Sequence, residues 1–186
     1  RLMGKRVWTM DELVQAIGGV QVYRDWPAWQ EWRGFDGKFL QELGGQELTY
    51  QGKRGFVYRQ LLLPVRIDGE LIGGVRCRLK SKKGQPSYLN TAGEWSSERG
   101  LFPYDHVAGM GKKYVILVEG PRDAMRLVRI GVPALCILGA GMFNRKKALL
   151  VAALDPDCVF LLGDGDKAGR KFNESAYEHL NELVPT

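Results

Sequence analysis

Four carboxylates stand in two pairs, each at a point where a buried strand is expected to end. The pairs are Glu119 and Asp123, after an apolar run at residues 114–118, and Asp164 and Asp166, after an apolar run at residues 159–162. In an open parallel sheet, ligands bind beyond the carboxyl ends of the strands. If the two runs form neighbouring strands, up to four carboxylates meet at one edge of the sheet.

Carboxylates crowded in this way repel one another unless a positive charge lies between them, and a hard divalent cation supplies that charge. Mg²⁺ suits oxygen ligands, keeps several waters and takes further ligands from substrate phosphates. The chemistry indicated is phosphodiester or nucleotidyl transfer. We expect Gly163, Gly165 and Gly169 to let phosphates approach the backbone.

Each pair taken alone also has an ordinary structural explanation. An Asp-Gly-Asp turn before a helix is a common cap, and a Glu-Gly-Pro turn carries no function by itself. A calcium loop starting at Asp164 is excluded, because Ala168 and Ser175 then occupy ligand positions. Neither a dinucleotide-binding loop nor a Walker motif is found. The pairing of two acidic turns at successive strand ends favours a catalytic site.

The elements that position these carboxylates alternate between strand and helix after residue 111. We expect strands at residues 114–118, 134–138 and 159–162. Helices are expected from Pro121, after Asn144, and along an apolar stripe from Ala168 to Leu183. This β-α-β-α-β-α order predicts a parallel sheet with crossover helices.

The first 50 residues are expected to be helical and loop-rich. Thr9 can cap a helix that Gly18 would end. Trp26, Trp29 and Trp32 recur at helical spacing, and we assign them to the core. A surface for a partner or for base stacking is the alternative for such a stripe.

A β-hairpin with one basic face is predicted next. Residues 56–67 and the run from Leu71 flank an Asp68-Gly69 turn. In the second run, apolar residues alternate with cations, so the cations share one face. Residues 71–93 contain no acid, and their cations are Arg76, Arg78, Lys80, Lys82 and Lys83. Tyr88 and Asn90 follow in a loop that is suited to contacting a ligand, although both are also ordinary loop residues.

Composition limits the class of protein. The 186 residues carry a net charge of +6 and suffice for one domain or two small subdomains. Three isolated cysteines and two histidines provide neither a disulfide framework nor a zinc site. Neither a secretory signal nor a membrane span is expected, and the expected location is the cytoplasm.

Two segments resemble the Toprim domain, a module of DnaG-type primases, topoisomerases and some nucleases. They are VILVEGPRDAMRL at 115–127 and VFLLGDGDKAGRK at 159–171. The resemblance implies that Glu119, Asp164 and Asp166 bind Mg²⁺, which Mn²⁺ can replace, and that Asp123 assists them. Lys167 and Arg170, in the continuation typical of primases, are expected to contact nucleotide or nucleic acid.

The upstream half is similar to segments that precede Toprim in DnaG-type primases. The matching stretches are LLLPVRIDGELIGGVRCRL at 61–79, PSYLN at 86–90 and LFPYD at 101–105. In that family a basic surface guides template and nucleotides. The resemblance therefore implies the RNA-polymerising core of a bacterial or phage DNA primase, acting on single-stranded DNA and ribonucleoside triphosphates.

The expected architecture is α/β, with a Rossmann-like Toprim sheet at residues 111–186. A smaller basic α+β subdomain is expected at residues 1–110. The usual zinc module and downstream acidic motif of such primases are not found, so we expect a piece of a larger protein that works with a fused or separate replicative helicase. A Toprim nuclease, or a non-catalytic nucleic-acid-binding module with this fold, is the alternative.

Overall fold

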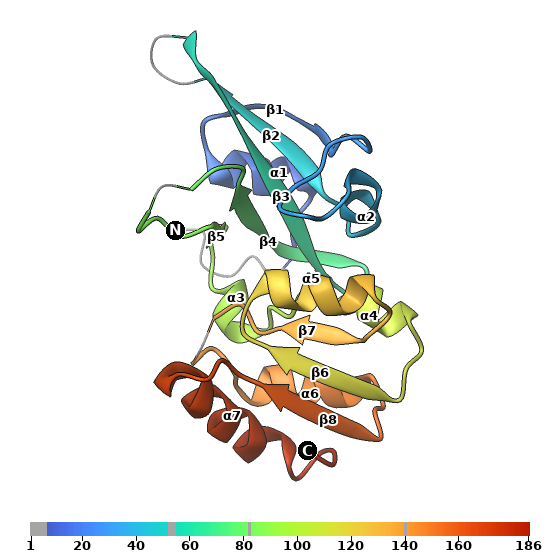
Figure 1. Ribbon diagram of the computed structural model, residues 1–186. Coiled ribbons are helices and arrows are strands. Elements are labelled where there is room, and N and C mark those ends of the chain that lie inside the picture. The colour runs from blue at the N-terminus through green and yellow to red at the C-terminus, as the bar shows by residue number, and fades with distance from the viewer. Residues whose placement is uncertain (1–6, 52–54, 82, 140) are drawn as a thin grey trace. The chain divides into compact units, whose positions relative to one another are not determined.

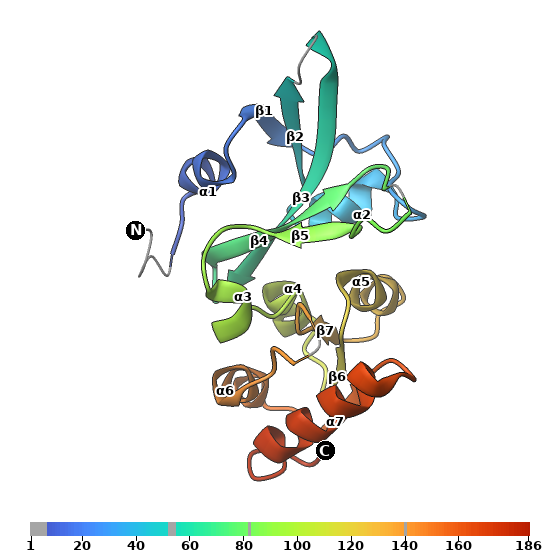
Figure 2. The same cartoon turned by 90° about the vertical axis from the view of Figure 1, so that its left-hand side faces the viewer.

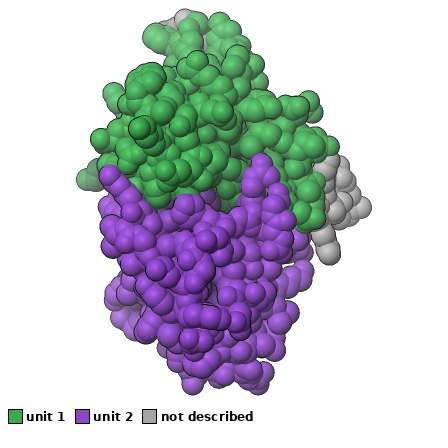
Figure 3. All heavy atoms as spheres, turned by 90° about the vertical axis from the view of Figure 1, so that its right-hand side faces the viewer, with its two compact units in different colours: residues 1–65, 70–93 green, residues 66–69, 94–186 purple. Residues whose placement is uncertain are grey.

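The computed structural model describes residues 7–51, 55–81, 83–139 and 141–186. The chain divides into two compact units, one of residues 1–65 and 70–93 and the other of residues 66–69 and 94–186 (Figure 3). The elements of the first are α1 (Met10–Ile17), β1 (Val20–Asp25), α2 (Gly37–Glu42), β2 (Gln46–Gln51), β3 (Val57–Ile67), β4 (Glu70–Arg78) and β5 (Tyr88–Asn90). The second contains α3 (Trp95–Glu98), α4 (Tyr104–Gly109), β6 (Tyr114–Val118), α5 (Pro121–Arg129), β7 (Ala134–Cys136), α6 (Arg145–Ala153), β8 (Cys158–Leu162) and α7 (Lys167–Leu180).

The first unit is built on a five-stranded sheet with the order β1-β2-β3-β4-β5 (Figure 1). The predicted hairpin is confirmed as β3 and β4. Asp68 and Gly69 connect these strands with φ angles of 53° and 80°. Asp-Gly pairs suit such a turn, because both central residues need positive φ. Strands β1 and β2 were not predicted from the sequence, and the burial of β1 does not alternate, because Val22 is exposed and the register shifts between Val20 and Val22.

Helix α1 covers this sheet and closes its core. Thr9 caps the helix as expected and forms a capping box with Glu12, and Gly18 ends the helix at a φ of 72°. Gly74 of β4 lies under the helix, where a Cβ would stand 2.7 Å from a methyl carbon of Leu62. The core cluster consists of Trp8, Leu13, Val14, Leu48, Leu62 and Leu71.

The tryptophan segment between β1 and α2 is not a helix, and the assignment of all three indoles to the core is wrong for one of them. Trp26 and Trp32 are 0% and 3% exposed, but Trp29 is 80% exposed. A reverse turn closes where the backbone N–H of Gln30 donates to the carbonyl of Pro27. Spacing of three residues places side chains on one face only in a helix, so the turn sends Trp29 outward.

The second unit contains the predicted parallel sheet, with β6 between β7 and β8. Both pairings are parallel, and Val118 at the end of β6 stands level with Leu162 at the end of β8. The three strands point the same way in Figure 1, and Figures 1 and 2 show α5 and α6 on opposite faces of the sheet. The crossover from β6 to β7 and the crossover from β7 back past β6 to β8 run in opposite directions, so right-handed connections place α5 and α6 on opposite faces.

One strand of the second unit is shorter than expected. Strand β7 ends at Cys136, two residues early, because Leu138 adopts a φ of 65° and leaves the extended conformation. The boundary expected after residue 110 stays a prediction; residues 94–110 pack within the second compact unit. In the part of the chain that the structure describes, no helix has the length and apolar character needed to span a membrane.

Candidate active site at the carboxyl edge of the parallel sheet

Glu119 and Asp164 are joined directly at the ends of the two neighbouring strands. The Oε1 atom of Glu119 accepts a hydrogen bond of 2.9 Å from the backbone N–H of Asp164. Glu119 is half-buried and Asp164 is exposed. The two acidic turns therefore meet at one edge, as parallel pairing of β6 and β8 requires.

The Asp-Gly-Asp turn is held in place by close packing against α7. A Cβ at Gly169 would overlap the backbone of Asp164, and a Cβ at Gly163 would stand 2.5 Å from the carbonyl oxygen of Gly169. At Gly165 nothing lies within 4 Å of an added Cβ. Two of the three glycines thus serve the contact between turn and helix, and only Gly165 offers the open backbone that we expected of all three.

Asp166 and Arg170 secure the start of α7. Asp166 is the N-cap of the helix, and its Oδ1 accepts the N–H of Gly169 at 2.9 Å. Arg170 donates from Nη1 to the carbonyl of Gly165 at 3.1 Å. Lys167, the first residue of the helix, is exposed. Arg170, which was predicted to contact nucleotide, therefore holds the turn between Asp164 and Asp166 through its hydrogen bond to Gly165.

Asp123 shares a cleft of about 420 Å³ with Glu119 and Asp164. It lies in the first turn of α5 and makes an ion pair of 3.1 Å with Arg126, which the sequence analysis did not single out. Asp166 is not among the residues that line the cleft. Among the described residues, no three acidic, histidine or cysteine side chains converge closely enough to hold a metal ion. The proposed ligand set thus stays a prediction.

In the first unit, the cations and the polar residues predicted to bind nucleic acid divide between two faces of the sheet. Strand β5 pairs with β4 so that Asn90 is opposite Val75 and Tyr88 is opposite Cys77. Directly opposed residues point to the same side, so Tyr88 and Asn90 share the face of Val75 and Cys77, whereas Arg76 and Arg78 point to the other. The expected loop at Tyr88 and Asn90 is therefore a strand.

The cations of the basic row differ in their burial and in their hydrogen-bond partners. Arg76 is half-buried, and within the described residues its Nε is buried without a hydrogen-bond acceptor. Arg78 donates to the carbonyl of Pro86 at 2.5 Å, and Lys80 lies past the strand end, exposed to solvent. Lys82 lies outside the described residues. Of Arg76, Arg78 and Lys80, Lys80 is the residue that is exposed to solvent.

Comparison with known proteins identifies the parallel unit. A family model described as the Toprim domain matches residues 114–186. These residues form a Toprim domain. The matched stretch begins with β6 and contains all four carboxylates. No protein with a curated description matches the chain.

Solved structures with the same fold are catalytic cores of DnaG-type primases. The zinc-binding and RNA polymerase domains of the Aquifex aeolicus primase align at a TM-score of 0.53 and 25% identity, over 74% of this chain and 36% of that one. A DnaG catalytic domain bound to single-stranded DNA aligns at 0.54 and 25%, over 64% and 38%. The RNA polymerase domain of Mycobacterium tuberculosis DnaG aligns at 0.56 and 23%, over 81% and 62%. The chain thus spans between 36% and 62% of the length of these proteins.

Beneath the acidic edge of the Toprim domain lie two buried side chains that sequence reasoning did not connect with the site. The thiol of Cys136 donates to the backbone carbonyl of Glu119 at 3.1 Å, and burial raises its pKa to about 12. Lys147 of α6 is 0% exposed and donates to the carbonyl of Ile137 at 2.8 Å. Burial lowers the pKa of this lysine to about 8. The only signal in the sequence was a lysine near the start of a helix, which is ordinarily a solvated position.

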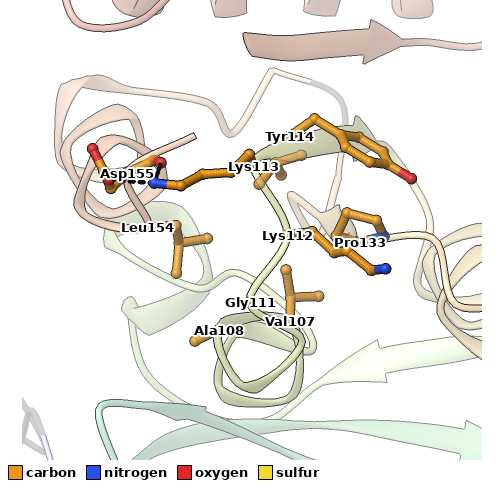
Figure 4. A pocket seen from close by; sticks show the side chains of 10 residues that line it. Val107, Ala108, Gly111, Lys112, Lys113, Tyr114, Pro133, Leu154 and Asp155 are labelled. Carbon is orange, nitrogen blue, oxygen red and sulfur yellow. Dashed lines mark hydrogen bonds and ion pairs between the residues drawn. The ribbon is translucent and has the colours of Figure 1, made fainter. Parts of the chain in front are cut away.

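A smaller cleft at the opposite, amino-terminal end of β6 has a different character (Figure 4). Its volume is about 140 Å³, below the roughly 300 Å³ of typical small-molecule sites. Apolar side chains such as Val107, Pro133 and Leu154 form much of its wall, and Lys113 there is paired with Asp155 at 2.7 Å. The carboxyl edge is therefore the better candidate for chemistry in the Toprim domain.

Proposed function

We propose that this chain is the catalytic core of a DnaG-type DNA primase, which joins ribonucleotides into short primers on a single-stranded DNA template. The observation that carries the proposal is the hydrogen bond between Glu119 and Asp164, which brings the two acidic turns of the Toprim domain together. The fold shared with primase catalytic cores supports it.

The residues at the carboxyl edge fit a hard divalent cation in their chemistry. Glu119, Asp164 and Asp166 offer carboxylate oxygens alone, which is the donor type that Mg²⁺ and Mn²⁺ prefer. Bound there, the ion would neutralise the charge that develops on the attacking hydroxyl and on the leaving pyrophosphate. The second oxygens of these carboxylates are the natural contacts, since Oε1 of Glu119 and Oδ1 of Asp166 accept backbone N–H groups.

The reaction proposed is displacement at phosphorus. The 3'-hydroxyl oxygen of one ribonucleotide forms a bond to the α-phosphorus of an incoming triphosphate. The bond from that phosphorus to the bridging oxygen breaks, and pyrophosphate leaves. We assign the role of accepting or relaying the hydroxyl proton to Asp123, which lines the cleft and is paired with Arg126. Most of the acceleration in such a reaction comes from placement and charge neutralisation.

Binding of the strand is assigned to the basic face of β4. The half-buried Arg76 and the exposed Lys80 would contact backbone phosphates, which position a strand without specifying its sequence. Arg78 is expected to act mainly by holding the segment that contains Pro86.

The test is a synthesis assay with single-stranded template, ribonucleoside triphosphates and Mg²⁺ or Mn²⁺, run beside a cleavage assay on a labelled oligonucleotide. Asp166→Asn is the diagnostic variant, because asparagine caps a helix as well as aspartate does and only the charge is lost. Metal-dependent dinucleotide or primer formation that disappears in this variant supports the proposal. Cutting without synthesis would identify a Toprim nuclease, and strand binding without either activity would identify a binding module.

A further inference from the structure

Trp29 has the highest exposed fraction among the large apolar side chains that the structure describes as exposed, at 80%. The other four tryptophans, Trp8, Trp26, Trp32 and Trp95, are between 0% and 7% exposed. Aromatic side chains gain most from burial, so an indole left almost wholly in solvent has a binding surface to offer. The position is in the first unit, outside the Toprim domain.

The turn that presents Trp29 is anchored at both ends. Before it, Trp26 is fully buried and donates from its indole nitrogen to the carbonyl of Gln30 at 2.8 Å. After it, Gly37 at the start of α2 packs so closely on the turn that a Cβ would overlap the carbonyl oxygen of Pro27. An aromatic ring held on a fixed turn loses little conformational freedom on binding.

The segment that follows this turn carries a cation and is fastened to the end of β4. The indole nitrogen of Trp32 donates to the carbonyl of Arg78 at 3.2 Å. Arg33 donates to the hydroxyl of Ser81 at 2.8 Å, and its guanidinium lies 5.7 Å from the centroid of the Trp32 ring. The nearest acid in sequence, Glu31, is occupied by the backbone N–H of Gly34. An exposed ring on a segment fastened to the end of the basic strand β4 is complementary to a single strand with unpaired bases.

We propose that Trp29 is a stacking platform for an unpaired nucleobase, while Arg33 and Lys80, which follows the end of β4, hold the flanking phosphates. The inference rests on the proposed function in taking single-stranded DNA as the partner. Aromatic rings beside basic grooves bind single strands largely without sequence preference, because every base has a π-face. The site is therefore a subsite that grips the strand whatever its sequence.

The test compares binding of the 186-residue chain to an oligo-dT strand and to an abasic strand with the same number of phosphates. For Trp29→Ala we expect oligo-dT affinity to fall roughly 5- to 100-fold. Affinity for the abasic strand and the slope of log affinity against log salt should stay at the parental values, since no phosphate contact is removed. Trp29→Phe should recover part of the lost affinity, and Tyr177→Ala, an exposed aromatic of α7, serves as the matched control.

Fluorescence gives a second readout, because Trp29 is the indole that solvent reaches. Oligo-dT should quench a fraction of the parental emission, and that quenching should be absent in Trp29→Phe.

The inference would be overturned if the parent and Trp29→Ala bound oligo-dT with equal affinity. It would also be overturned if Trp29→Ala lost as much affinity for the abasic strand as for oligo-dT. If the parental chain synthesises primers and Trp29→Ala binds oligo-dT with parental affinity, only the stacking subsite is contradicted. If the parental chain binds oligo-dT through Trp29 but does not synthesise primers, only the proposed function is contradicted.

Discussion

Glu119 reaches across the end of the parallel sheet to accept the backbone N–H of Asp164 at 2.9 Å. The same carboxylate is therefore an anchor for the Asp-Gly-Asp turn and a proposed ligand for a cation. These two roles are separable, because a neutral amide keeps a hydrogen-bond acceptor and removes the charge.

The first prediction uses that difference at Glu119. Glu119→Gln should weaken Mg²⁺ or Mn²⁺ binding by at least roughly 10-fold and abolish synthesis. Its unfolding free energy should stay within about 0.5 kcal/mol of the parental value, because the acceptor for Asp164 remains. Glu119→Ala should lose metal binding and also about 1 kcal/mol of stability. Calorimetric metal titration and thermal unfolding followed by circular dichroism measure both quantities.

A control for Glu119→Gln is Glu174→Gln, which removes an exposed carboxylate of α7. It should leave metal affinity unchanged. Parental metal affinity in Glu119→Gln would remove this residue from the ligand set, whatever the activity of the variant.

The second prediction contrasts two glycines of the same turn. Gly169→Ala introduces a Cβ that overlaps the backbone of Asp164, so it should destabilise the protein by about 1 to 3 kcal/mol and displace the aspartate from the site. Gly165→Ala meets nothing within 4 Å, so its stability should be close to parental. Denaturant unfolding and primer synthesis are measured on both. If both variants unfold at the same denaturant concentration, the turn is not held by α7 as described.

The activity of the stable Gly165→Ala variant then answers a separate question. A phosphate that approaches the backbone at Gly165 would be obstructed by the new methyl group, and synthesis would fall without a change in stability. Parental activity would mean that phosphates approach elsewhere.

The Toprim sheet was predictable because its signals are local and consistent. Pro121 and Asn144 mark helix starts, the apolar runs have strand length, and the two acidic turns follow directly on those runs. Parallel pairing of neighbours then brings Glu119 and Asp164 to one edge. Such inferences need only the chain direction and the topology.

The structural features that could not be predicted from the sequence depend on tertiary contacts. Trp29 has the spacing of a core residue and is exposed because Pro27 and Gly37 impose a turn. Lys147 resembles a solvated lysine and is buried because the carbonyl of Ile137 provides a partner inside the unit. Tyr88 and Asn90 face away from the basic row because of the register of β5, which short strands do not specify on their own.

The third prediction tests that register. Arg76→Ala should lower affinity for single-stranded DNA and reduce the slope of log affinity against log salt by about 0.7, the value for one phosphate contact. The double variant Tyr88→Phe and Asn90→Ala should keep the parental slope, because its side chains lie on the other face. Fluorescence anisotropy with a labelled strand at several salt concentrations measures both. An unchanged slope in Arg76→Ala would show that this arginine is not a phosphate contact.

The fourth prediction concerns the buried ammonium of Lys147, whose folded-state pKa of about 8 lies below its ordinary value of 10.5 because burial disfavours the charge. Between these two values the unfolded chain binds more protons than the folded one, so stability rises with pH in that window. The cost of burying the charge is fully present below pH 8 and is relieved as the pH approaches 10.5.

Lys147→Met fills a similar volume without a charge, and it loses the bond to Ile137 at every pH. The stability of the parent relative to Lys147→Met should therefore increase by about 2 to 3 kcal/mol from pH 7 to pH 10. Urea unfolding of both proteins at the two pH values gives this difference directly, and contributions from Lys113 and other groups common to both proteins cancel. A difference that stays constant with pH would mean that Lys147 keeps an ordinary pKa in the folded protein, and that its ammonium is solvated rather than buried beneath the acidic edge.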